Sequence, residues 1–345
     1  MTTPTLYRFQ MAGLFEAEEP IIHTEETIGT IAKIKRMKVL SAGKPVLVPA
    51  LSGNSFRGQL RDLIADHFLE MVRGDGEKIR MSPDTYGVIF SGGVMKKGSD
   101  LSAQMEQLMQ AVPLLRVWGS AFGNVMLPSK IFITHLIPLT RETRTILDEP
   151  LSQLRNGSHP LVQRLQELEN SLPAAESITY EEGPLTRKDD SKNPIALKDV
   201  ELTERPPNAP PQQMIYQVEC IASGTMLLHR IGTKFPLTEI ELGCLMDGLI
   251  AFARVPTVGG RSAAGYGQVN FIYHLLLQPS SGASEEYWLD AGLLKTIQED
   301  GQDTLARALR AYREDVRNRA SEIRQALSPT AESPAQAEEA REEPE

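Results

Sequence analysis

Apolar and polar residues alternate along two early stretches of the chain. Residues 4–15 keep the two kinds on opposite parities, and residues 28–40, IGTIAKIKRMKVL, do so again with lysines along one edge. A period of two is typical of a β-strand. We therefore expect a first strand over 4–15 and an extended arm or hairpin over 28–40.

The period changes to three and four in the next stretch. The apolar positions between 54 and 72 form one helical stripe, made of Phe56, Leu60, Leu63, Ile64, Phe68 and Met71. This stripe predicts a helix with one buried face, and Ser52 or Asn54 can cap its start. The glycine-rich residues 74–99 predict a loop region with little regular structure.

Later stretches supply the remaining core elements. A buried strand, a strand pair or bent strand, a helix and a last strand are expected over 131–139, 213–231, 238–254 and 267–277. Short helices are expected over 100–110 and 158–171. Without the insertions the order is βαββαβ, which predicts an α+β fold of the ferredoxin-like kind, the frame of the RNA-recognition fold.

The middle and the end of the chain depart from this pattern. Residues 181–211 contain almost no core-forming run and are too long for an ordinary connection. From about 285 the chain is expected to be helical, with an amphipathic stripe of Leu305, Leu309, Tyr312, Val316, Ala320, Ile323 and Leu327. We expect a core over 1–278 with an insertion over 74–130, a C-terminal helix over 285–327 and a disordered acidic tail over 328–345.

Composition limits the class of protein. Cys220 and Cys244 are the only cysteines, and they have neither metal-ligand spacing nor the number of a disulfide framework. The N-terminus lacks the pattern of a signal peptide, and no apolar run approaches the roughly 20 residues that span a bilayer. We expect a cytoplasmic protein with no cofactor, no metal and no membrane contact.

Charge is distributed unevenly along the chain. The net charge is −9, but the tail 328–345 has six Glu against one Arg, and 29–73 has eight basic against three acidic residues. One face of an acidic molecule can therefore be basic. A solvated charged face without a ligand is the alternative.

Two arginines stand one turn apart near the start of the first predicted helix. In VPALSGNSFRGQLRDL, Arg57 and Arg61 are i and i+4, so both project from one face, and Gly53 and Gly58 let a ligand approach the backbone. Helix N–H groups and the arginine fork both suit phosphate. The alternative is an ion pair, with Asp62 or a tertiary partner.

A glycine-rich loop precedes the last predicted strand. Residues 258–267 surround Arg261, Ser262 and Tyr266 with glycines, but neither GxxxxGK[ST] nor GxGxxG after a strand is present. A flexible loop with an Arg and an aromatic residue suits an RNA backbone and base. A tight turn before a strand is the alternative. The six histidines are scattered, and no nucleophile constellation stands out.

These parts together resemble a known family. VPALSGNSFRGQLRDL, LLRVWGSAFGN at 114–124 and GGRSAAGYGQV at 259–269 resemble, in this order, three motifs of CRISPR-associated RAMP proteins. The resemblance covers roughly residues 5–278. One ferredoxin-like domain with a long mid-chain insertion is similar to the repeated backbone subunit of CRISPR effector complexes, and the wording of the first motif is similar to the type IV version.

The resemblance implies an RNA-binding scaffold. Copies of the chain would stack into a helical filament along a guide RNA, with other effector-complex subunits, and the guide would pair with a target nucleic acid. Because the contacts would go to phosphate and ribose, binding would not depend on the base sequence of the guide. The implied RNA-binding residues are Lys33, Lys35, Arg36, Lys38, Asn54, Ser55, Arg57, Arg61, Arg116, Arg261, Ser262 and Tyr266.

The insertion 177–212 would be the thumb of such a subunit. The resemblance implies a hairpin that folds over the RNA of the neighbouring subunit. Its charge is balanced between 186 and 205, so we expect it to wedge the RNA with apolar side chains. The thumb residues in question are Arg187, Lys188, Lys192, Ile195, Leu197 and Leu202.

One departure from the family concerns catalysis. Type III backbone subunits place a catalytic Asp before the first helix, whereas here the first Asp is Asp62, inside the predicted helix. We therefore expect no RNase activity. The alternatives are a metal-dependent RNA endonuclease of the type III kind, in which Glu25 or Glu26 replaces the Asp, a guide-processing nuclease that uses His23, or a protein that binds only protein partners through a helix over 303–327.

Overall fold

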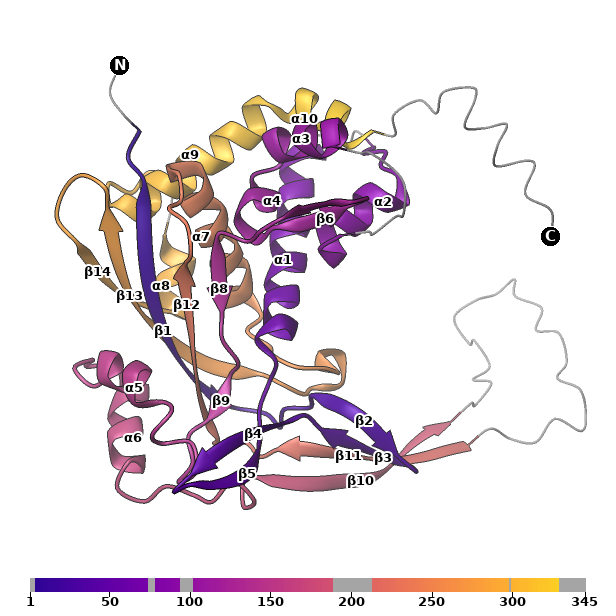
Figure 1. Cartoon of the computed structure of the whole chain (residues 1–345), viewed down its shortest axis with the longest axis vertical. Helices are drawn as coiled ribbons and strands as arrows, with labels where there is room; N and C mark the ends of the chain where they lie inside the picture. The colour runs from indigo at the N-terminus through magenta and orange to yellow at the C-terminus, as the bar shows by residue number, and fades with distance from the viewer. Residues whose placement is uncertain (1–3, 74–77, 94–101, 189–212, 298, 329–345) are drawn as a thin grey trace, which may run out of the picture.

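The protein is described from a computed structural model. The structure describes residues 4–73, 78–93, 102–188, 213–297 and 299–328 (Figure 1). Among these residues, no helix combines the length and the apolar character that crossing a membrane would need.

One antiparallel sheet forms the centre of the molecule. Its order is β14-β13-β1-β12-β8, and β9 also pairs with β12. The strands are β1 (Tyr7–Ala17), β8 (Ile131–Ile133), β9 (Ile137–Pro138), β12 (Met226–Thr233), β13 (Val269–Pro279) and β14 (Glu285–Asp290). If β14 is set aside and β8 and β9 are counted together, the sheet has the antiparallel 4-1-3-2 order that a βαββαβ unit gives, as predicted.

Two long helices and two short ones sandwich this sheet. The alternation along β1 turns Phe9, Met11 and Phe15 towards α1 (Gly53–Arg73) and α7 (Glu239–Arg254). Phe15 meets Phe56 of α1 and Phe252 of α7, with ring centroids 5.7 and 5.9 Å apart. The other parity of β1 packs in a second apolar cluster with α5 (Asp148–Leu154) and α6 (Pro160–Leu168).

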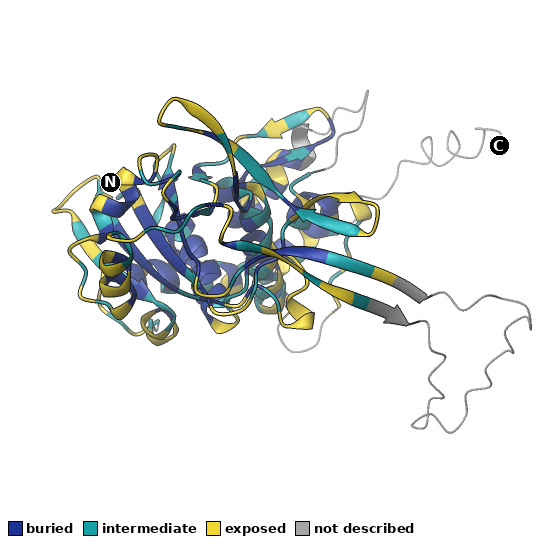
Figure 2. Ribbon diagram, turned by 90° about the horizontal axis from the view of Figure 1, so that it is seen from below, coloured by how far each residue is buried: buried dark blue, intermediate teal, exposed yellow. Residues whose placement is uncertain are grey.

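A second sheet projects from one end of the core. Its order is β10-β11-β3-β2, from β10 (Thr179–Lys188), β11 (Gln213–Ile221), β3 (Ile31–Ile34) and β2 (Thr24–Ile28). Beside it lies the hairpin of β4 (Arg36–Ser41) and β5 (Lys44–Pro49). Figure 2 shows the ribbon of β10 and β11 extending away from the body of the molecule. The predicted arm over 28–40 therefore belongs to two hairpins. β10 lies within the insertion 177–212 that is predicted to be a thumb, whereas β11 begins directly after it, and we call the pair of β10 and β11 the thumb stem.

The insertion after α1 has more regular structure than predicted. The expectation of a loop over 74–99 is wrong for Pro83–Tyr86, a short helix α2, and for Gly87–Ser91, a π-helical turn η1. The helices α3 (Ser102–Ala111) and α4 (Pro113–Trp118) follow, and then the hairpin of β6 (Ser120–Phe122) and β7 (Val125–Leu127). Gly92, in the left-handed conformation, ends the π-helical turn.

The C-terminal segment is not one helix. Residues Glu285–Asp290 form the edge strand β14, so the expected helix from 285 is wrong there. Three helices follow, α8 (Ala291–Thr296), α9 (Thr304–Asn318) and α10 (Ala320–Leu327). The predicted stripe of α9 and α10 is buried at Leu305, Leu309, Tyr312, Val316, Ile323 and Leu327, and it packs in the main core. The amphipathic stripe expected from the sequence therefore packs on the core of the same chain.

Candidate nucleic-acid interface

The start of α1 is fixed by two histidines and a close backbone contact. The N–H groups of Ser52 and Gly53 donate to His23 Nε2 at 3.1 Å and His135 Nδ1 at 2.9 Å. Burial and the nearby Lys35 lower the pKa of His23, which keeps its imidazole neutral and able to accept. A Cβ on Gly53 would lie 2.6 Å from the carbonyl oxygens that end β8, so this glycine serves packing.

The first polar side chains of α1 remain at the surface. Ser52, one of the two predicted caps, accepts a hydrogen bond from the N–H of Asn54 at 3.2 Å. Asn54 is exposed and Ser55 is half-buried. Both border a cavity of about 440 Å³ that His23, Glu25 and Lys35 also line.

Arg61 does not face solvent. Only 4 % of its surface is exposed. It donates from Nη1 to the carbonyl oxygen of Val88 at 3.3 Å, and from Nη2 to those of Trp118 at 3.1 Å and Gly119 at 2.6 Å. A cation is favourable against the last carbonyl groups of a helix such as α4. This differs from the expected phosphate contact, because the buried fork is already occupied by backbone oxygens.

Arg57 stands one turn earlier and is half-buried. One terminal nitrogen donates to the carbonyl oxygen of Trp118, while Nε is buried without a hydrogen-bond partner among the described residues. Burial lowers the pKa of Arg57. Burial and the nearby Arg57 lower the pKa of Arg61 to about 10. Both side chains remain cationic at neutral pH, so two positive charges lie together, with Asp62 as the acidic group that acts on Arg61.

The three motifs of the sequence meet at this helix. Arg57 and Arg61 bind Trp118 in the second motif. Gln59 donates to the carbonyl oxygen of Gly259 in the third motif at 2.8 Å. Residues far apart in the chain are therefore held in one place by side chains of the first two turns of α1.

The predicted basic arm is paired with carboxylates. Lys33 Nζ lies 2.6 Å from Glu181 of β10, and Lys35 Nζ lies 2.8 Å from Glu25. Arg36 binds both oxygens of Glu219 on β11. Lys38 is exposed on β4. Lys33 and Arg36 thus bind carboxylates of β10 and β11, and three of the four arm cations are paired with carboxylates of the described residues.

The Glu219 pair differs from the two lysine pairs in burial. Burial by itself would raise the pKa of Glu219, but the hydrogen bonds from Arg36 and from the N–H of Ile34 hold it below its usual value. Glu219 is almost fully buried, whereas both lysine pairs are open to solvent. Exposed pairs of this kind contribute little to stability, so Lys33 and Lys35 can change partners easily.

Arg116 is half-buried and binds groups of its own chain. Its Nε donates to Glu241 of α7 at 3.2 Å, and Nη1 donates to the carbonyl oxygen of Met109 at 2.6 Å. Lys130 also binds Glu241, at 2.8 Å. The structure therefore uses Arg116 to join α3, α4 and α7, which differs from the expected RNA contact.

The glycine loop lies against the thumb stem. Arg261 adopts the left-handed conformation with φ +60°, and its guanidinium carbon lies 4.6 Å from the ring centroid of Tyr216 on β11. Arg261 and Ser262 are exposed, while Tyr266 is half-buried. Burial and a hydrogen bond with Glu182 raise the pKa of Tyr266 to about 12. The loop thus presents Arg261 and Ser262 on the side of the molecule that carries the stem.

Most of the predicted thumb residues fall outside this description. Lys192, Ile195, Leu197 and Leu202 lie outside the described residues. Arg187 and Lys188 belong to β10, where their backbones pair with Met214 and Gln213. Their proposed contacts stay predictions.

Sequence reasoning missed the residues that hold the site together. His135 has no motif around it, and Gln59 lies within the first motif without having been picked out. Both side chains bind backbone groups. Glu219 gave one signal, since it is a single acid within the apolar strand QMIYQVECI. A lone carboxylate in such a strand is typical of a buried ion pair.

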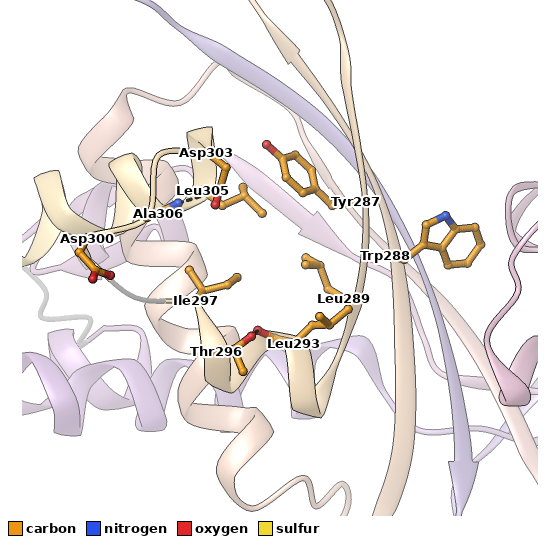
Figure 3. Close-up of a pocket in the computed structure, with 11 residues that line it drawn as sticks. Tyr287, Trp288, Leu289, Leu293, Thr296, Ile297, Asp300, Asp303, Leu305 and Ala306 are labelled. Atoms are coloured by element: carbon orange, nitrogen blue, oxygen red, sulfur yellow. Dashed lines mark hydrogen bonds between the residues drawn. The ribbon is translucent and has the colours of Figure 1, made fainter.

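A different cavity lies at the edge of the central sheet. It measures about 330 Å³ and is bounded by β14, α8 and the start of α9 (Figure 3). Leu289, Ile297 and Leu305 line it together with Asp300 and Asp303. Asp303 caps α9 by accepting from the N–H of Ala306 at 2.9 Å. Carboxylates at its rim make this cavity unsuited to phosphate.

Comparisons with known proteins concern the fold. No family model and no curated protein matches the sequence. Among solved structures, a chain of a Type IV-B CRISPR complex is similar, with 16% identity and a TM-score of 0.45, over 85% of this chain and 100% of that one. A crystal structure of Thermofilum pendens Csc2 is similar with 13% identity and a TM-score of 0.38, over 93% and 81%.

Proposed function

We propose that this chain is a non-catalytic RNA-binding scaffold of a CRISPR effector complex, in which copies line up along a guide RNA. The observation that carries the proposal is the meeting of the three motifs at the start of α1. The exposed Asn54 and the cation Arg57 lie there, and the arm and the glycine loop add Lys33, Lys38 and Arg261. Phosphate and ribose contacts from such a surface suit any guide sequence.

The arrangement of the arm and the thumb stem supports the same proposal. Lys33 lies on β3, which pairs with β11, and Lys35 borders the cavity at the start of α1. A strand bound along the arm would pass the base of the projecting ribbon of β10 and β11 (Figure 2). Other effector-complex subunits and a base-paired target complete the proposed assembly in the cytoplasm.

The test is RNA retention by the purified chain. We expect a high ratio of absorbance at 260 to 280 nm and a large particle on size exclusion. Replacing the exposed cations Lys38 and Arg261 together with Arg57 by Ala should release RNA, and the slope of log affinity against log salt should fall by about 0.7 for each lost phosphate contact. Arg73→Ala, at the far end of α1, is the control and should bind as the wild type. RNA retained by the triple variant would refute the proposal.

A second candidate function is RNA cleavage. The observation that favours it is the cavity in which His23, Glu25 and Lys35 lie beside Ser52 and Ser55. Against it, His23 Nε2 already accepts from the backbone, and the described residues hold no cluster of three or more His, Cys, Asp or Glu side chains that could bind a metal ion. Cleavage of a guide or target RNA that is lost in the triple variant of His23, Glu25 and Glu26 to Ala would establish this function instead.

A further inference from the structure

A cavity of about 480 Å³ lies on the other side of the start of α1. Its walls are the outer face of α1, the turn at Gly92, the end of α4 and the hairpin of β6 and β7. Arg57, Arg61 and Lys234 line it, and no Asp or Glu is among the described residues that do so. Two desolvated guanidinium groups and an ammonium group without a carboxylate attract an anion.

Gly58 gives the second, independent observation. It lies inside α1, where glycine destabilises a helix relative to alanine. A Cβ on Gly58 would meet no atom of the described residues within 4 Å, in contrast to Gly53, whose Cβ would strike β8 carbonyl oxygens. Packing therefore does not account for Gly58. The residue borders the cavity, so the missing side chain leaves room for something that approaches the helix backbone.

The cavity has an apolar side as well. Met126 lines it and is 74 % exposed, although most large apolar side chains of the protein are buried. Phe90 lines it from the π-helical turn, and Ser91 and Ser120 offer hydroxyl groups. A volume of this size, with cations at one side and apolar surface with hydroxyl groups at the other, fits a ligand that is acidic at one end and flat and partly apolar at the other.

We propose that this cavity takes one nucleotide of the bound RNA, with its phosphate on Arg57 and Lys234 and its base against Met126 and Phe90. Arg57 lines the cavity as a half-buried cation, so its guanidinium group can meet a phosphate there. Gly58 leaves the space for the ribose. This inference rests on the proposed function and adds to it a site that holds a base as well as a backbone.

The test uses the full chain freed of RNA by nuclease and a high-salt wash. Gly58→Leu fills the cavity from an open helix position, and Gly58→Ala adds a single carbon as the matched control. We expect Gly58→Leu to weaken binding of a ten-residue oligouridylate by tenfold or more, and Gly58→Ala by less than threefold. Both variants should unfold at or above the wild-type temperature, which separates a blocked cavity from a damaged fold.

Small ligands identify the chemistry. Titration with adenosine 5′-monophosphate should give at least tenfold tighter binding than inorganic phosphate or adenosine, and Gly58→Leu should abolish it. If the wild type binds the oligonucleotide and Gly58→Leu binds it equally well, the inference is overturned while the proposed function stands. If the wild type binds neither the oligonucleotide nor the monophosphate, both are overturned. Phosphate alone binding as tightly as the monophosphate would also overturn the base contact.

Discussion

Arg61→Lys separates a structural arginine from a phosphate-binding one. The substitution keeps the positive charge but removes the planar fork, so it would weaken a bidentate phosphate contact without disturbing the fold. The fork of Arg61 instead spans two segments, the π-helical turn at Val88 and the end of α4 at Trp118 and Gly119. The three donors of lysine radiate from one atom, so they cannot reach both segments from the same position. At least one buried carbonyl group then loses its partner.

The size of the effect follows from these contacts. Hydrogen bonds to a charged group contribute about 1.5–3 kcal/mol each, and a buried acceptor left without a donor costs about 1–3 kcal/mol. Losing one or two of the three bonds should therefore lower the free energy of unfolding by about 2–4 kcal/mol. For a chain of this size that corresponds to a fall of about 3–6 °C in the unfolding temperature.

The assay is thermal and urea unfolding followed by far-ultraviolet circular dichroism, with RNA binding measured in parallel. Arg57→Lys is the matched control, one turn away and half-buried, and it should shift the unfolding temperature less. An Arg61→Lys variant that unfolds within about 1 °C of the wild type, but has lost RNA, would show that Arg61 serves the ligand and that our reading of its burial is wrong.

Two further predictions concern the core. Gly243→Ala should destabilise the protein by about 3 kcal/mol, because its Cβ would lie 1.9 Å from the carbonyl oxygen of Ala308 and force α7 and α9 apart. Gly58→Ala, on an open helix face, is the control and should not destabilise it. A Gly243→Ala variant that melts at the wild-type temperature would contradict the contact. Burial lowers the pKa of His229 to about 3, below its unfolded value of about 6.5. The stability that the buried, neutral imidazole contributes is therefore fully present above pH 6.5 and is lost as the pH falls towards 3. Between pH 7.5 and 5 this should cost about 2 kcal/mol, which urea unfolding can measure, and His229→Phe should flatten that part of the profile.

The sequence predicted the core elements because their periodicity is local. The alternation of 4–15 and the stripe of Phe56 to Met71 each lie within one stretch, and β1 and α1 begin and end close to the expected residues. The edge strand β14 was missed because EEYWLD is short, and its pairing with β13 decides its conformation. The hydrophobic period of one segment does not show which distant strand it will pair with.

The candidate site was predicted only in part, for a related reason. The motif around Arg57 and Arg61 does mark the meeting point of the three segments, but the role of Arg61 depends on carbonyl oxygens 27, 57 and 58 residues away. Every residue carries a backbone carbonyl group, so the residue type at a position does not show that its carbonyl oxygen binds an arginine. The carboxylates opposite the arm, Glu181 and Glu219, could not be matched to Lys33 and Arg36 without knowing that β11 lies beside β3.

The ion pairs of Lys33 and Lys35 affect which polyanions the chain would bind in the proposed function. Each phosphate that approaches Lys33 or Lys35 must first separate an existing pair with Glu181 or Glu25, so one new contact replaces one old contact and the net gain is small. A lone phosphate or a short acidic peptide gains almost nothing in this exchange. In the proposed function, a continuous strand would contact several cations at once and release its own condensed counterions, so a long polyanion would gain more than a short one.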